Sequence, residues 1–261
     1  MKVLFLCHPE VDIGEFSLFD GLCELLGDEN VVTYPYKKTY NGQVADDYFL
    51  DNGKKGYTPP YDYVLKRSQV PKTIEEIKKE IDSFSLVVLA SPRSYAINAF
   101  REIKDKICQP FVFHESEDYE DFRFDLINEF RPMVFFKRTL RKDSKNQFRE
   151  NIKYDVPIFP LPLAAITNTA PMVDDTVKKY EVWSVQSNTY PLREKIFERL
   201  KQKNYLNSII DFAGKGWSRS DNQYSLQYVD FMTTIAQSKI GVGSRGWSDD
   251  MQKRLELPLY E

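Results

Sequence analysis

Short runs of apolar residues alternate with helical periodicity along the first half of the chain, and this alternation constrains the fold most. Apolar residues recur every three or four positions from Phe16 to Leu26, which is typical of an amphipathic helix. Strands that are apolar throughout are buried on both faces of a sheet. We therefore expect a doubly wound α/β unit with a parallel sheet. Its five strands are predicted at residues 2–7, 30–34, 85–90, 110–113 and 133–136.

A second, shorter series of the same kind follows. Strands are predicted at residues 180–185, 208–213 and 239–242, and helices at residues 192–203 and 224–236. The chain between the two series is highly charged and then rich in proline, which is typical of a linker. The expected organisation is an N-terminal α/β domain at residues 1–140, a linker or excursion at 141–177, and a C-terminal α/β domain at 178–261.

Composition excludes several classes of protein. The formal net charge is −3, so the chain has no overall positive charge that would indicate nucleic acid as a partner. No apolar run approaches the ~20 residues that a membrane span needs, and the first predicted strand, at Lys2, leaves no room for a signal peptide. The three cysteines form neither a disulfide framework nor a zinc pattern. We expect a cytoplasmic protein.

Ligands of doubly wound sheets bind outside the carboxyl ends of the strands. The two histidines of the chain, His8 and His114, both follow predicted strands, where they can serve as general bases or phosphate contacts, although loops also tolerate histidine by chance. The acidic group after the fourth strand can hold a metal, act as a base or begin a helix. The same rule also selects Asp12, Ser91, Arg93, Glu115, Glu117, Asp118, Lys137 and Arg138.

The second series contains two candidate phosphate-binding loops. Residues 185–193 include Ser187 and Asn188 and can offer backbone N–H groups, but they lack the glycines of a dinucleotide fingerprint. After the last predicted strand, Gly243 and Gly246 allow close backbone approach, and Arg245 can hold a diphosphate through a bidentate fork. The alternative interpretation is a glycine-rich surface turn with solvated charges.

Several sequence boxes resemble those of a sparsely characterised group of bacterial and viral proteins similar to GT-B glycosyltransferases. Residues 17–25 (SLFDGLCEL) and 31–35 (VVTYP) are similar to the S-L-x-x-G-L-x-x-L helix and V-V-x-Y-P strand that open these proteins. Tyr40 and residues 53–58 fit the loop that follows in the group. The F-K-R-E-L and S-K-I-G-L-x-x-R-G boxes of the group are matched by residues 136–140 (FKRTL) and 238–246 (SKIGVGSRG).

The resemblance implies two Rossmann-like units, with Arg245 near the donor diphosphate and Glu256 on the ribose. The group usually continues with D-T-x-R-x-x-E, of which this chain keeps Asp250 and Glu256 but has Met251 for threonine and Lys253 for arginine. The group also extends through a further helix and strand. The C-terminal unit is therefore expected to be short or truncated, with a nucleotide site that is incomplete or completed by another segment or a partner chain, for example in a homo-oligomer.

The function implied is transfer of a sugar from a nucleotide-sugar donor to a hydroxyl acceptor, without a metal or other cofactor. The acceptor is expected against the first unit, with His8, Asp12, His114 and Glu117 as candidates for the base. The donor is expected against Ser187, Asn188 and the loop from Gly243 to Glu256, and Lys137 and Arg138 are candidates for contact with a phosphate or acid group. Two alternatives stay open: a non-catalytic nucleotide- or carbohydrate-binding relative, and a flavodoxin-like binding or signalling module.

Overall fold

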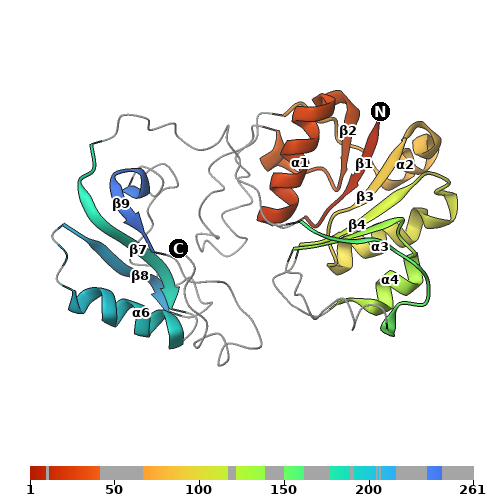
Figure 1. The fold of residues 1–261 in the computed structure, drawn as a ribbon. Coiled ribbons are helices and arrows are strands. Elements are labelled where there is room, and N and C mark those ends of the chain that lie inside the picture. The colour runs from red at the N-terminus through yellow and green to blue at the C-terminus, as the bar shows by residue number, and fades with distance from the viewer. Residues whose placement is uncertain are drawn as a thin grey trace. The chain divides into compact units, whose positions relative to one another are not determined.

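The computed structural model forms two compact units, each of which is described by itself (Figure 1). The described residues up to Leu161 belong to the first unit, and those from Val177 belong to the second. The structure describes residues 1–9, 12–41, 67–116, 122–138, 150–161, 177–188, 191–203, 205, 207–215 and 234–242.

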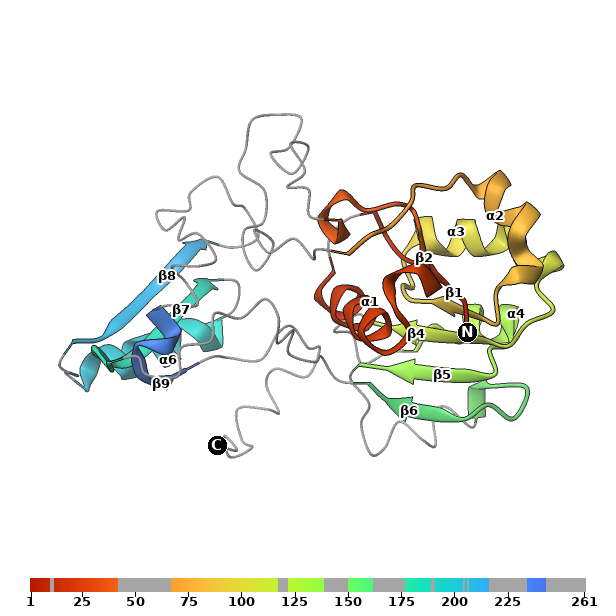
Figure 2. The same cartoon turned by 90° about the horizontal axis from the view of Figure 1, so that it is seen from above.

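A parallel sheet of six strands forms the centre of the first unit, in the order β2-β1-β3-β4-β5-β6. Every neighbouring pair runs parallel. The expected parallel α/β sheet is confirmed, and its Rossmann-like arrangement is plain in Figure 2. The strands are β1 (Val3–Leu6), β2 (Val31–Tyr34), β3 (Leu86–Leu89), β4 (Phe111–Glu115), β5 (Val134–Lys137) and β6 (Ile158–Pro160).

Local signals in the sequence set the helix ends. Asp12 caps the N-terminus of α1, and Thr73 forms a capping box with Glu76 at the start of α2. Helix α1 ends at Gly27, whose φ of 87° favours glycine. The helices are α1 (Ile13–Leu26), α2 (Ile74–Glu80), α3 (Ser94–Ile103) and α4 (Phe124–Phe130), with short 3-10 turns at Asp28–Asn30, Lys38–Tyr40, Ile81–Ser83 and Lys104–Lys106.

The two faces of the sheet carry separate hydrophobic cores. Successive residues of a strand point to opposite faces, so Leu4 packs on one side and Phe5 on the other. Helix α1 covers the face of Phe5, and helices α2, α3 and α4 supply the core on the face of Leu4 (Figure 2). This two-sided burial explains why the strands are apolar throughout.

The first sheet extends past residue 140, into the stretch expected as a linker. Strand β6 pairs with β5, with Phe135 opposite Ile158, and Val156 is buried in the core on the α3 face. Residues 150–161 therefore belong to the first unit, which has six strands where five were expected. Their apolar residues are spaced among charges and prolines, so they show no continuous run. Proline is tolerated there because β6 is an edge strand.

The second unit holds a smaller parallel sheet of three strands, in the order β8-β7-β9. Phe197 of its helix is buried, as are Val182 and Trp183 of the central strand. Residues 234–236 are helical, and the rest of the helix expected at 224–236 lies outside the described residues. The elements are β7 (Tyr180–Asn188), α6 (Pro191–Gln202), β8 (Ile209–Lys215) and β9 (Ser238–Gly241).

Candidate functional site

The order of the strands identifies one edge of the first sheet as the place for a ligand. The chain passes from β1 to β2 on one side of β1 and then crosses to β3 on the other side. In open α/β sheets, ligands bind outside the carboxyl ends of the strands at this switch in direction. The residues that follow β1 and β3 there include His8, Asp12, Ser91 and Arg93, which are among the residues expected to form the site.

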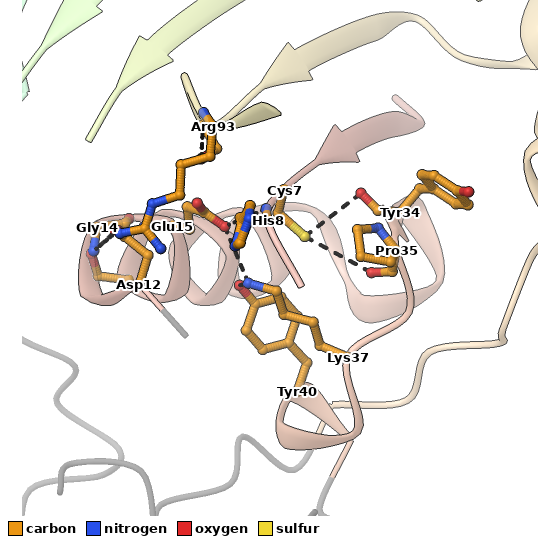
Figure 3. Close-up of polar contacts among 12 residues, drawn as sticks. Cys7, His8, Asp12, Gly14, Glu15, Tyr34, Pro35, Lys37, Tyr40 and Arg93 are labelled. Atoms are coloured by element: carbon orange, nitrogen blue, oxygen red, sulfur yellow. Dashed lines mark hydrogen bonds and ion pairs between the residues drawn. The ribbon is translucent and has the colours of Figure 1, made fainter. Parts of the chain in front are cut away.

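Asp12 is engaged in structural contacts at the N-terminus of α1. Its Oδ1 accepts hydrogen bonds from the backbone N–H of Gly14 at 2.8 Å and of Glu15 at 3.1 Å. Its Oδ2 lies 3.5 Å from Nη2 of Arg93, at the start of α3 (Figure 3). The positive end of the α1 dipole therefore already faces a carboxylate.

Glu15 forms a buried hub one turn further along α1. Its Oε2 accepts from the backbone N–H of His8 at 2.9 Å and from Nζ of Lys37 at 3.1 Å (Figure 3). Lys37 also donates to the Tyr40 hydroxyl at 3.3 Å. Burial raises the pKa of the Glu15 carboxyl, Lys37 opposes this rise and Asp12 adds to it. The pair fixes the turn after β1 to the segment after β2.

Cys7 lies beside this hub and is chemically inert. Its thiol is buried and donates weakly to the carbonyl oxygens of Tyr34 at 3.7 Å and Pro35 at 3.8 Å. Burial raises the pKa of the Cys7 thiol to about 12, and the nearby Lys37 only partly counteracts this. Because the thiolate is the reactive form, Cys7 is not a candidate nucleophile.

His8 stands at the rim of the site. It directly follows Cys7 at the end of β1 and is half-buried. Its ring packs edge-on against Tyr95 with centroids 6.5 Å apart, and Tyr95 is itself 40% exposed. Its backbone N–H is held by Glu15, so His8 combines a fixed position with partial exposure of the residue.

His114, at the end of β4, is far more buried, with 3% of its surface exposed. Among the described residues its Nδ1 has no hydrogen-bond partner. Burial lowers its pKa to about 4; Asp12 opposes this shift, and Arg138 and Lys137 add to it. The imidazole is therefore neutral at pH 7, whereas a general base works best with a pKa near the operating pH.

Glu115 and Lys137 form a second buried ion pair at the same edge of the sheet. They lie opposite each other in the β4–β5 register, with Nζ 2.6 Å from Oε1, and neither side chain is more than 2% exposed. Burial raises the pKa of Glu115, and Lys137 counteracts the rise. The phosphate contact expected of Lys137 would require this pair to open. Arg138 donates to the backbone carbonyl of Ser116 at 3.2 Å.

Most of the expected donor-binding residues lie outside the described part of the chain. Ser187 and Asn188 lie in strand β7 and not in a loop, because the pairing with β8 continues to Asn188 opposite Lys215. Their side chains are not described. The other expected residues outside the described part are Glu117, Asp118, Gly243, Arg245, Gly246, Asp250 and Glu256.

Sequence reasoning missed Glu15 and Lys37, and it named Tyr40 only as part of a loop that resembles the group. Glu15 stands three residues after the cap Asp12, and an acidic residue at this position is a recognisable signal of a helix start. Lys37 has no comparable local signal, because its partner is 22 residues away. Among the described residues, no group of three or more histidine, cysteine or acidic side chains is arranged to hold a metal ion.

The chain was compared with known proteins. No protein-family model matches it, and no curated protein shows a significant match. Within the described ranges, no helix combines the length and apolar character needed to cross a membrane.

Proposed function

We propose that the chain is a GT-B-like glycosyltransferase that moves a sugar from a nucleotide-sugar donor to a hydroxyl of an acceptor. The acceptor binds at the carboxyl edge of the first sheet, and His8 takes the proton from its hydroxyl. Two observations support the class of protein: both units are built on parallel sheets, and the boxes at residues 17–25, 31–35, 136–140 and 238–246 resemble those of the group.

The observation that carries the proposal is the acidic lining of the switch point. A helix N-terminus normally attracts phosphate, but Asp12 already accepts from the first backbone N–H groups of α1, and the Glu15 carboxyl lies just behind it. A phosphate there would have to displace Asp12 from these N–H groups. Carboxylate and imidazole groups accept hydrogen bonds from hydroxyls, so this edge suits an acceptor alcohol better than a nucleotide.

Among the expected candidates that the structure describes, His8 is the best base because the other two are engaged or buried. Asp12 is committed to capping α1 and to Arg93, and His114 is almost completely buried with a depressed pKa. Half-buried His8 keeps its ring at the rim. A positioned general base contributes about 10²- to 10⁴-fold to a rate, which sets the effect expected on removing the imidazole.

The donor is proposed to bind to the second unit, because Asp12 occupies the N–H groups of α1 that would bind a phosphate in the first unit. The leaving diphosphate needs positive charge or helix N-termini to stabilise it, and Arg245 with the neighbouring glycines offers such groups in sequence. Glu256 accepts hydrogen bonds from the ribose in this proposal, and no metal is required. Because the D-T-x-R-x-x-E box is altered, a partner chain or a further segment completes the donor site.

One observation favours a second candidate, a flavodoxin-like module. The strand order β2-β1-β3-β4-β5 is the order of that fold, in which a flavin binds at the switch between β1 and β3. The carboxylates of Asp12 and Glu15 oppose a flavin phosphate at this place. Titration with FMN separates the two, because a flavodoxin-like site quenches flavin fluorescence and a glycosyltransferase does not.

Nucleoside diphosphate release tests the proposal. The full chain is incubated with UDP-, GDP-, ADP- and dTDP-sugars, with and without sugar acceptors. We expect release from one donor, stimulated by an acceptor and reduced at least ~100-fold in His8→Asn. Arg101→Gln is the matched control, since it alters contacts between α3 and α4 away from the site, namely the ion pair with Glu129 and a cation–π contact with Phe130. Nucleotide binding without any release would instead indicate a non-catalytic relative.

A further inference from the structure

Two polar side-chain atoms, one near the end of strand β4 and one just after the strand, are buried and have no hydrogen-bond partner among the described residues. They are Nδ1 of His114 and Oγ of Ser116. The side chain of His114 is 3% exposed and that of Ser116 is fully buried. Buried polar side chains in folded proteins nearly always have a hydrogen-bond partner. Two such atoms without a partner, two residues apart in the sequence, therefore require an explanation.

The strand geometry places these two atoms on one face of the sheet. Successive residues of a strand point to opposite faces, so His114 and Glu115 lie on opposite faces; Ser116 directly follows β4, and an extended continuation of the strand puts it on the face of His114. Val112, two positions before His114, packs in the core beneath α1, whereas Phe113 packs on the α3 face. The His114 imidazole therefore lies on the α1 face, outside the last apolar layer of the core, and Ser116 follows it directly after the strand.

Charged groups of both signs surround this position. Burial lowers the pKa of His114. The charge of Asp12 opposes this shift, and the charges of Arg138 and Lys137 add to it. Lys137 is already paired with Glu115, and Asp12 lies near Arg93. A neutral imidazole and a serine hydroxyl each donate and accept hydrogen bonds, which matches the hydroxyls of an uncharged ligand.

We propose that His114 and Ser116 form a subsite that binds neighbouring hydroxyls of an uncharged polyol, on the α1 face at the end of β4. This rests on the proposed function for its place in catalysis, where it names the acceptor as a neutral carbohydrate or polyol. Binding itself does not depend on transfer. His114 is in this account a positioning residue, and His8 remains the base.

The two histidines make a direct test practical. With 15N-labelled histidine the full chain gives two sets of ring signals, which His8→Asn assigns. Methyl glucoside, myo-inositol and glycerol are each titrated, with inorganic phosphate as the charged comparison. We expect at least one polyol to shift the His114 ring signals saturably, at unchanged affinity between low and high salt. Ser116→Ala should weaken this binding roughly tenfold, and exposed Ser85→Ala should not.

Several results would overturn the subsite. If no polyol moves the His114 signals of the folded protein, or if Ser116→Ala binds as tightly as the wild type, the two atoms are not a ligand site. If only phosphate shifts the ring, and salt abolishes the effect, the position binds anions. Polyol binding without nucleoside diphosphate release leaves the subsite standing and removes the transferase, and release without polyol binding at His114 does the reverse.

Discussion

Nζ of Lys37 lies 3.1 Å from Oε2 of Glu15, and neither side chain is more than 3% exposed. The same Oε2 also accepts the backbone N–H of His8, so the ion pair reaches directly to the candidate base. The pair joins the turn after β1, the first turn of α1 and the segment after β2. A single carboxylate, that of Glu15, therefore holds both Lys37 and the backbone of His8 in position.

Removing one member of this pair should destabilise the protein strongly. In Lys37→Met, the Glu15 carboxylate loses its charge partner in a buried setting, which typically costs about 3–5 kcal/mol in the free energy of unfolding. The double variant Glu15→Leu with Lys37→Met should recover much of this loss, because it buries no charge. Urea unfolding measures both. A cost for Lys37→Met below about 1 kcal/mol would mean that the pair is not buried in solution.

His114 should make stability depend on pH in a defined window. Its folded pKa of about 4 lies below its ordinary value of 6.5, so the unfolded chain binds more protons between these values. Its contribution is present above pH 6.5 and declines as the pH falls towards 4, by at most roughly 3 kcal/mol. Unfolding curves of wild type and His114→Gln should therefore converge as the pH falls. Parallel curves across this range would contradict the burial of a neutral imidazole.

Asp12 should act as a helix cap and not as the base. Asp12→Asn keeps a side-chain oxygen that accepts from Gly14 and Glu15, so stability and transfer should change little. Asp12→Ala should lose about 0.5–2 kcal/mol of stability. Thermal unfolding and the diphosphate-release assay are measured on both variants. Loss of transfer in Asp12→Asn, at wild-type stability, would instead make Asp12 the base.

Arg245 should contribute to donor affinity through a charge-assisted contact. Arg245→Ala should lose about 1.5–3 kcal/mol, or roughly 10- to 150-fold, in the affinity for the nucleoside diphosphate. Arg245→Lys should recover only part of this, since an ammonium does not reproduce the bidentate fork. Calorimetric titration with UDP and GDP measures the effect. Equal affinity in wild type and alanine variant would show that Arg245 is structural.

The parts of the fold with local signals were predictable from the sequence. Sequence patterns predicted the first five strands and the helix at residues 16–26, because continuous apolar runs and helical spacing indicate which residues are buried. Strand β6 was not, since an edge strand interrupted by prolines has no apolar run. The extension of β7 to Asn188 depends on pairing with β8, which no local pattern in residues 185–188 reveals.

The same distinction holds for the candidate site. His8 and His114 were found because the ends of parallel strands share one edge, which follows from topology alone. The roles of these two residues were not predictable, because they depend on burial, which the sequence does not show. His8 is half-buried, whereas His114 is 3% exposed. Lys137 looked like a phosphate contact in sequence, and only its register opposite Glu115 reveals the ion pair.

The most direct measurement of the central claim is the mass of the acceptor after incubation with the donor that the panel identifies. The account predicts an acceptor heavier by one sugar unit, formed in equal amount to the nucleoside diphosphate and almost absent with His8→Asn. Arg101→Gln should give the wild-type yield. Diphosphate release with no glycosylated product, or full product formation by His8→Asn, would contradict the proposed transfer and its base.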